Sequence, residues 1–193
     1  MRVSEQQRTT TETDISLSLN LDGAGSFQGT SGVGFLDHML TAFCVHGGFD
    51  LALTMKGDLQ VDCHHSIEDL GIVLGTALKE ALGDKKGIRR YGQSLIPMDE
   101  ALASCVLDLS GRPYLVFQAQ FQNQSVGAMD CCMVQEFFRA LAFNSGMTLH
   151  VSLLYGENDH HKIEALFKAL AYALKAAVRL NADGSAVSTK GVL

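Results

Sequence analysis

The sequence predicts an α+β fold built by internal duplication, and three observations support this prediction. The pattern His-His-x-Ile-Glu occurs twice, beginning at His64 and His160, and an apolar helical segment follows each copy. The two copies lie 96 residues apart, which is half of the 193-residue chain. The segments upstream of each copy also match in the same order, as expected for two copies of one structural unit.

The elements of each half are expected in a fixed order. Alternating apolar and polar residues, typical of half-buried strands, occur in ETDISLSLNLDG from Glu12 and in EALASCVLDLSG from Glu100. Amphipathic segments that end in Gly follow, LDHMLTAFCVHGG and VQEFFRALAFNSG. A further alternating run, FDLALTMKG or MTLHVSLLYG, precedes each His pair, which opens the last helix. Each half therefore predicts strand, strand, helix, strand, helix.

The two halves, about residues 8–90 and 91–193, are expected to form a single domain over residues 1–193. No linker rich in Gly, Ser or Pro separates them. The join, GDKKGIRRYGQSLIPMD, is interpreted as a short basic turn. The C-terminal segment NADGSAVSTKGVL lacks helical periodicity and is interpreted as an ordered or mobile tail.

Composition excludes several classes of function. Hydrophobic residues make up 47% of the chain, which is enough for a substantial core and excludes general disorder. The net charge is −6 and no basic run could track the phosphates of a nucleic acid, so nucleic acid is not an expected partner. No apolar stretch approaches about 18 residues, so no membrane partner is expected. Five cysteines without paired spacing indicate reduced thiols in a cytoplasmic protein.

The duplicated motif predicts a metal centre. In each copy the histidines precede the glutamate by four and three residues, so each histidine can share a helical face with the glutamate. Adjacent histidines diverge by about 100° around a helix, so two helices are expected to serve two ions. One copy alone would equally fit solvated or helix-capping histidines, but two equivalent copies favour divalent transition metals. His38 and Glu136 occupy equivalent positions in the amphipathic segments, and the eight candidate ligands are His38, His64, His65, Glu68, Glu136, His160, His161 and Glu164.

These motifs closely resemble the imidazoleglycerol-phosphate dehydratase family of histidine biosynthesis. The matching strings cover the chain from about Arg8 to Leu193 and are GFLDHML, HHSIEDLGIVLGTAL, GIRRYG, MDEALA, DLSGRPYL, NDHHKIEALFKALAYAL and STKGVL. The resemblance implies a hydro-lyase that converts D-erythro-imidazoleglycerol phosphate to imidazoleacetol phosphate with two Mn²⁺ per active site. It also implies a homo-oligomer of 24 subunits, and a fold of two four-stranded sheets with helices between them, of the ribosomal protein S5 domain 2-like type.

The resemblance also implies roles for individual residues. The family's metal pattern falls on seven of the eight candidate ligands, and the eighth position, often His in relatives, is Glu136. Glu12 aligns with an acidic residue near the reacting carbons and is the candidate catalytic acid or base, although alone it would be interpreted as a solvated residue. Arg112 alone would be interpreted as a turn residue. The candidates for substrate binding, mainly of the phosphate, are Glu12, His46, Arg90, Arg112, Lys168, Ser188, Thr189 and Lys190.

Two other functions fit the same ligand set. A di-metal phosphatase or other metallohydrolase would use the same ligands and phosphate-binding cations, but would release free phosphate. A non-catalytic, metal-bridged assembly would need the ligands without Arg90, Arg112 and Lys190. His150, on a strand face, is expected to be a solvent-facing residue without a function.

Overall fold

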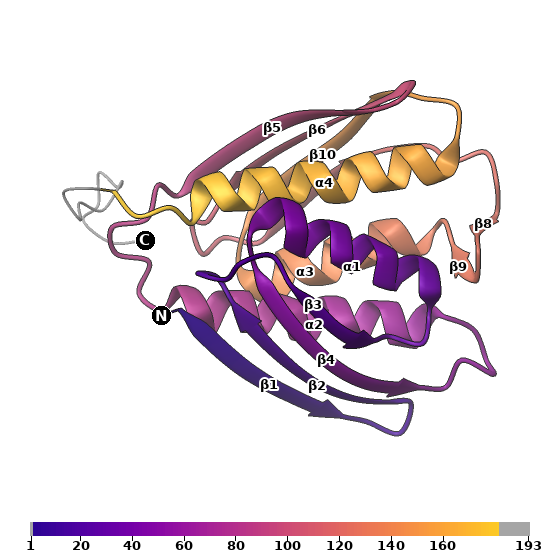
Figure 1. Cartoon of the computed structure of the whole chain (residues 1–193), viewed down its shortest axis with the longest axis horizontal. Helices are drawn as coiled ribbons and strands as arrows, with labels where there is room; N and C mark the ends of the chain where they lie inside the picture. Colours follow the sequence, from indigo (N-terminus) through magenta and orange to yellow (C-terminus); the bar gives the residue numbers. More distant parts are fainter. Residues whose placement is uncertain (1, 182–193) are drawn as a thin grey trace.

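The computed structural model describes residues 2–181, which form two four-stranded sheets, a small hairpin and four helices between the large sheets (Figure 1). The first half contains β1 (Val3–Thr9), β2 (Thr13–Asn20), β3 (Phe27–Thr30), α1 (Gly34–Gly47), β4 (Asp50–Gly57) and α2 (His64–Leu82). The second half contains β5 (Tyr91–Met98), β6 (Ala101–Asp108), β7 (Tyr114–Gln118), β8 (Ser125–Val126), β9 (Met129–Asp130), α3 (Met133–Ser145), β10 (Thr148–Tyr155) and α4 (Asp159–Ala177).

The two sheets have the same topology, which confirms the predicted duplicated α+β fold. Their strand orders are β1-β2-β4-β3 and β5-β6-β10-β7. In each sheet the last strand runs parallel to its neighbour and the other pairs are antiparallel. The β8–β9 hairpin is an addition of the second half. That both halves form a single domain over residues 1–193 stays a prediction.

Several strands were not expected from the sequence pattern. The order strand, strand, helix, strand, helix is wrong, because three strands precede the first helix of the first half and five precede the first helix of the second half. The polar N-terminal segment forms β1, and the interpretation of the join as a short turn is wrong because it contains all of β5. Residues 182–193, the predicted tail apart from its first residue, lie outside the described part of the chain.

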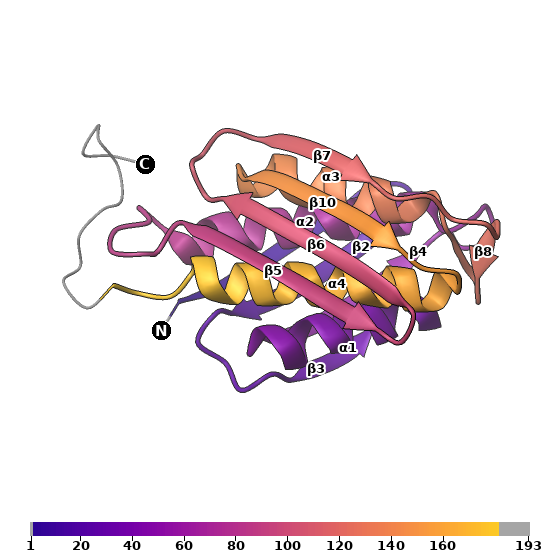
Figure 2. The same cartoon turned by 90° about the horizontal axis from the view of Figure 1, so that it is seen from above.

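The helices join the two halves. α2 and α4 lie on the inner faces of the first and second sheets, α2 packs against α3, and α1 packs against α4. Figure 2 shows the second sheet covering this helical layer. Both α2 and α4 begin at the end of the molecule far from the N-terminus, so the two His pairs lie at the same end (Figure 1).

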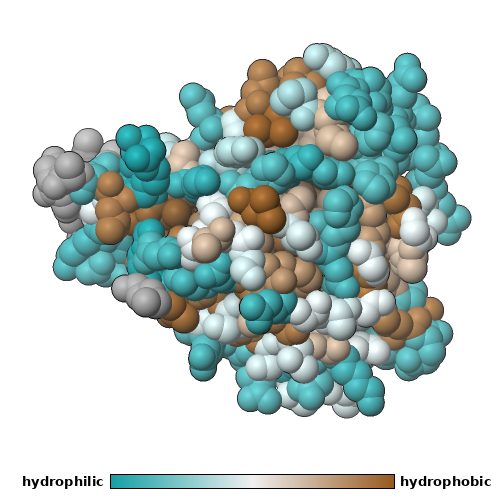
Figure 3. All heavy atoms as spheres, in the orientation of Figure 1, coloured by the Kyte–Doolittle hydropathy of each residue, from teal (hydrophilic) through white to brown (hydrophobic). Residues whose placement is uncertain are grey.

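The outer surfaces of the two sheets differ in polarity. The outward positions of β1 and β2 carry mainly Glu, Gln, Ser and Thr, whereas exposed apolar side chains on the second sheet include Tyr91, Leu95, Val106 and Tyr114. Figure 3 shows a hydrophobic area in the region of β5 and β6. Among residues 2–181, no helix combines the length and the apolar run needed to cross a bilayer.

Candidate metal centre

Three of the predicted ligands converge where α1 meets α4. His38 Nε2 and His160 Nε2 each lie 3.3 Å from Glu164 Oε2. One donor atom from each residue lies within 4.8 Å of the other two, and the described residues contain one such group. Two imidazole nitrogens and a carboxylate oxygen are a donor set that suits a divalent transition metal. The donor set therefore fits a metal ion, and its ligands come from both halves of the repeat.

Local contacts fix this group at the start of α4. Asn158 caps the helix by accepting a hydrogen bond from the backbone N–H of His160 at 2.9 Å. The Phe35 ring packs edge-on against the His160 ring, with centroids 4.9 Å apart. Glu164 follows His160 by one turn, and its Oε1 accepts from Lys168 Nζ at 2.6 Å. Burial alone would raise the pKa of Glu164, but the Lys168 hydrogen bond and charge, with the His38 contact, lower it overall.

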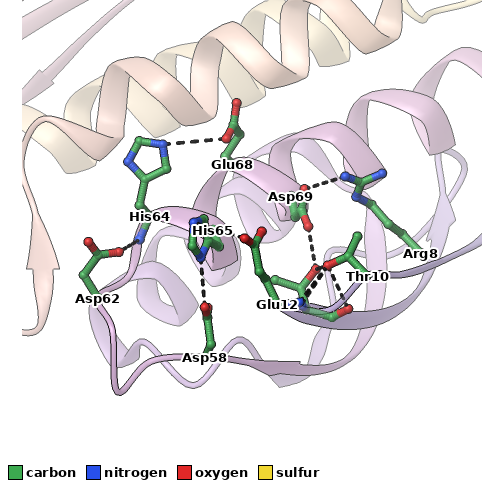
Figure 4. A network of polar contacts seen from close by, with 10 residues as sticks. Arg8, Thr10, Glu12, Asp58, Asp62, His64, His65, Glu68 and Asp69 are labelled. Atoms are coloured by element: carbon green, nitrogen blue, oxygen red, sulfur yellow. Dashed lines mark hydrogen bonds and ion pairs between the residues drawn. The ribbon is translucent and has the colours of Figure 1, made fainter.

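The second predicted set is less tightly gathered. His64 Nε2 lies 3.7 Å from Glu68 Oε2, and Asp62 accepts a hydrogen bond from the backbone N–H of His64 at 2.7 Å, the counterpart of the Asn158 cap (Figure 4). Glu136, on α3, has its carboxylate 2.9 Å from Arg139 Nη1. The structure thus brings His64 and Glu68 together, and shows Glu136 in an ion pair with Arg139.

The remaining two histidines are each oriented by a carboxylate. His65 Nδ1 lies 2.9 Å from Asp58 Oδ2, and His161 Nδ1 lies 2.7 Å from Glu100 Oε2. These hydrogen bonds raise the pKa of both histidines. The hydrogen bond with His161 is also the main cause that lowers the pKa of Glu100 to about 2. A carboxylate on Nδ1 fixes the ring and leaves Nε2 for a metal ion.

Asp58 and Glu100 were not predicted as part of the site. In the sequence Glu100 stood out as the repeat counterpart of Glu12 and within the string MDEALA, but 61 residues separate it from His161. Asp58 follows β4 directly, a position that carries no motif.

Glu12 lies at the tip of the β1–β2 turn beside α2. Its side chain is half exposed, and Oε1 lies 3.6 Å from His65 Nε2 (Figure 4). The structure therefore brings the candidate acid or base next to a candidate metal ligand, although the two lie far apart in the sequence.

His46 and Lys168 lie along the α1–α4 contact. Lys168 is one turn beyond Glu164, whereas His46 follows His38 by eight residues, or about 12 Å along α1. His46 Nδ1 lies 3.4 Å from the Tyr172 hydroxyl. Burial lowers the pKa of His46, and the Lys168 charge adds to this effect.

The two arginines predicted to bind phosphate lie at the other end of α4. Arg90 Nε and Nη2 donate to the two oxygens of Asp108 at 2.6 and 3.0 Å, and Arg112 Nη2 lies 3.6 Å from Asp108. The backbone N–H of Arg90 donates to the carbonyl of Ala177. Because Ala177 is 17 residues beyond His160, Arg90 lies roughly 25 Å from the metal group of its own chain. The other phosphate candidates, Ser188, Thr189 and Lys190, lie outside the described residues.

Comparison with known proteins decides the family. The family model described as "Imidazoleglycerol-phosphate dehydratase" matches residues 31–174. The chain belongs to the imidazoleglycerol-phosphate dehydratase family. A dehydratase of this name from Acetivibrio thermocellus is 58% identical over 193 residues, covering 100% of this chain and 99% of the relative. Another from Chlorobium chlorochromatii is 56% identical over 192 residues, covering 100% and 97%.

Solved structures of imidazoleglycerol-phosphate dehydratases have the same fold. The enzyme from Staphylococcus aureus matches with a TM-score of 0.85 and 44% identity, over 93% of this chain and 99% of that one. The enzyme from Pyrococcus furiosus, in complex with (S)-C348, matches with a TM-score of 0.83 and 37% identity, over 97% and 100%. The predicted hydro-lyase activity, a dehydration step in histidine biosynthesis, is confirmed by this membership.

Proposed function

We propose that the chain converts D-erythro-imidazoleglycerol phosphate to imidazoleacetol phosphate with two divalent cations, which we expect to be Mn²⁺. The eight predicted ligands would hold them. The observation that carries this proposal is the convergence of His38, His160 and Glu164 from the two halves of the repeat. When bound, the cations would supply Lewis-acid stabilisation of charge that develops on the substrate's imidazole ring.

Glu12 is the residue that we assign to proton transfer. Loss of water requires the hydroxyl group to leave the carbon beside the imidazole and a proton to leave the next carbon, which gives the enol form of imidazoleacetol phosphate. Glu12 can accept the proton or donate one to the departing hydroxyl, since its carboxylate is half exposed and lies beside His65. The metal-ligand carboxylates are poorer candidates, because their lone pairs would be committed to the cations.

The phosphate would be bound by Arg90, Arg112, Lys168, Ser188, Thr189 and Lys190, and His46 would contact the substrate. Guanidinium groups bind phosphate through paired hydrogen bonds, and Lys adds a point charge. A distance of roughly 25 Å between Arg90 and His160 along α4 is too large for one small substrate. We therefore propose that these arginines act on a site of a neighbouring subunit, in the 24-subunit assembly that the family leads us to expect.

The apolar outer surface of the second sheet supports this self-association, because exposed apolar patches commonly mark protein interfaces. We expect the assembly to be cytoplasmic. The predicted lack of nucleic-acid and membrane partners stays a prediction.

Turnover and metal content of the purified protein test the function. We expect imidazoleacetol phosphate as the product, its loss on chelation, and its recovery with added Mn²⁺. His160→Ala should lose both metal and turnover, whereas His150→Ala, which alters an exposed histidine on β10, should keep both. Release of free phosphate would instead indicate a metallohydrolase. Bound metal without turnover would indicate a metal-bridged assembly.

Size measurement tests the assembly. Histidine and carboxylate ligands must be deprotonated to bind a cation, so chelation or acid pH should remove the metal. If cations bridge subunits, the particle should then fall to smaller oligomers, and Mn²⁺ should restore both size and turnover. A metal-free particle of unchanged size would contradict a bridging role.

A further inference from the structure

A buried polar cluster lies directly behind the turn that carries Glu12. The Asp69 side chain is 9% exposed, and its two oxygens have different partners. Oδ1 lies 3.0 Å from Arg8 Nη2 (Figure 4). Oδ2 accepts a hydrogen bond from Thr13 Oγ1 at 2.5 Å. Arg8 is on β1, Thr13 begins β2 and Asp69 is on α2, so the cluster fastens both strands of the hairpin to the helix.

The same cluster is continuous with the turn itself. Thr10 Oγ1 accepts hydrogen bonds from the backbone N–H groups of Glu12 and Thr13 at 3.1 and 2.9 Å. The backbone N–H of Thr10 donates to the carbonyl of Thr13 at 2.8 Å. Thr13, which contacts Asp69, is thus also hydrogen-bonded to Thr10. The backbone is therefore held on both sides of Glu12.

The second half of the repeat shows that the fold does not require this cluster. By the matched registers, the counterparts of Arg8, Thr13 and Asp69 are the apolar residues Ile96, Ala101 and Ala165. Ala101 and Ala165 are at most 1% exposed, and Ile96 packs against the core. Apolar side chains thus fill these three positions in the second half without loss of the hairpin–helix packing, so we infer that the polar set has a role other than folding.

The two turn glutamates also differ in how they are held. Glu100 is fixed by its own carboxylate, which binds His161 Nδ1 and accepts from the backbone N–H groups of Glu157 and Asn158 at 3.1 and 2.7 Å. Glu12 has a single carboxylate contact among the described residues, the 3.6 Å approach to His65 Nε2. Its position therefore depends on its backbone, which the Arg8–Thr13–Asp69 cluster holds.

We infer that Arg8, Thr13 and Asp69 are positioning residues, which hold the Thr10–Thr13 turn so that the Glu12 carboxylate stays at the reacting carbons. This inference rests on the proposed role of Glu12 in proton transfer. The cluster acts through Glu12 and binds neither metal nor phosphate, so its loss should lower kcat while KM and metal content stay nearly unchanged.

The test replaces the cluster by its counterparts from the second half, in the triple variant R8I/T13A/D69A. All three partners are removed together, because single replacements would leave a buried charge unpaired. We expect kcat for imidazoleacetol phosphate formation to fall by about ten- to a hundredfold, since a displacement of about 1 Å can cost a hundredfold. KM should stay within about twofold, and metal content should not change.

Glu80→Gln provides a matched control, because it alters another polar contact between β1 and α2. Glu80 Oε2 accepts from Ser4 Oγ at 3.2 Å and from Gln6 Nε2 at 2.5 Å, away from the turn. This variant should keep its kcat. If R8I/T13A/D69A does not fold, Thr13→Val and Thr13→Ser replace it: the valine should lower kcat several-fold, and the serine, which keeps the hydroxyl, should restore it.

A double-mutant cycle with Glu12→Gln decides between positioning and a general structural effect. If the cluster acts through Glu12, R8I/T13A/D69A should cause no further loss of kcat in the Glu12→Gln background. An equal loss in both backgrounds, or full activity of the triple variant, would overturn the inference. Full activity of Glu12→Gln alone would instead contradict the proposed role of Glu12.

Discussion

Alanine at Gly71 and Gly75 should destabilise the protein, although alanine is the better helix former. These glycines lie in α2 where it crosses α3. A Cβ at Gly71 would lie 2.8 Å from the Ala140 Cβ and 2.9 Å from the Phe137 carbonyl oxygen. At Gly75 it would lie 2.8 Å from the Leu141 carbonyl oxygen. Because these neighbours belong to or adjoin the α3 backbone, the helices themselves must move apart.

The size of the effect follows from two opposing contributions. Alanine in a helix interior stabilises by about 1 kcal/mol per site relative to glycine. Overpacking a filled interface costs about 1–3 kcal/mol per site. For the double variant Gly71→Ala/Gly75→Ala the net loss is about 2 kcal/mol, which corresponds to a fall in Tm of roughly 4–8 °C for a chain of this length.

Thermal unfolding of the metal-free protein is the assay, so that cation binding does not contribute. Gly34→Ala is the matched control: it adds the same methyl group at the start of α1, where the new Cβ would meet no atom within 4 Å. The control should leave Tm unchanged or slightly raised. An equal Tm for the double variant and the control would refute the close packing of α2 on α3.

Three further predictions concern charged groups. Asp58→Asn and Glu100→Gln should weaken metal binding about ten- to a hundredfold, because each removes a carboxylate that orients a ligand histidine. Metal titration measures the affinity, and an unchanged affinity would show that these carboxylates do not support the ligand histidines. Arg112→Ala should raise KM roughly ten- to a hundredfold with metal content unchanged, through loss of a charged phosphate contact, and an unaltered KM would remove Arg112 from the site. The hydrogen bond from Arg2 lowers the pKa of Asp22 below its ordinary value of 3.8, so this pair stabilises the folded state above that pH. Asp22→Asn should therefore lower Tm at pH 7, and the difference in Tm from the unaltered protein should be smaller near pH 3. An equal difference in Tm at the two pH values would contradict a stabilising role of the Arg2–Asp22 pair.

The sequence predicted the strands that alternate and missed those that do not. In β2 the buried residues Ile15, Leu17 and Leu19 alternate with polar ones, which is a readable pattern. In β1 the one fully buried residue is Ser4, so no apolar alternation exists. The pattern of β5 is hard to recognise in the sequence because glycine, not an apolar residue, occupies the inward position 92. Gly92 faces α4, where any Cβ would lie 1.9 Å from the Ala173 carbonyl oxygen.

The candidate site was predictable where its chemistry is local. The spacing of His160 and Glu164 on one helix is visible in the sequence, and so is the repeat that relates it to His64 and Glu68. The contacts of Asp58 and Glu100 with the histidines depend on how hairpins and loops fold over the helix starts, and no local pattern encodes them.

Duplication gave the two halves the same elements, but equivalent carboxylates have taken different tasks. Glu100 uses its side chain to orient His161 and to accept two backbone hydrogen bonds, so it is committed to holding the start of α4. In the first half Asp58 orients His65 instead, which leaves Glu12 half exposed beside that ring. A carboxylate for proton transfer must remain available, and it can do so only if other groups fix its backbone. The polar cluster around Asp69, present only in the half that carries Glu12, meets that requirement.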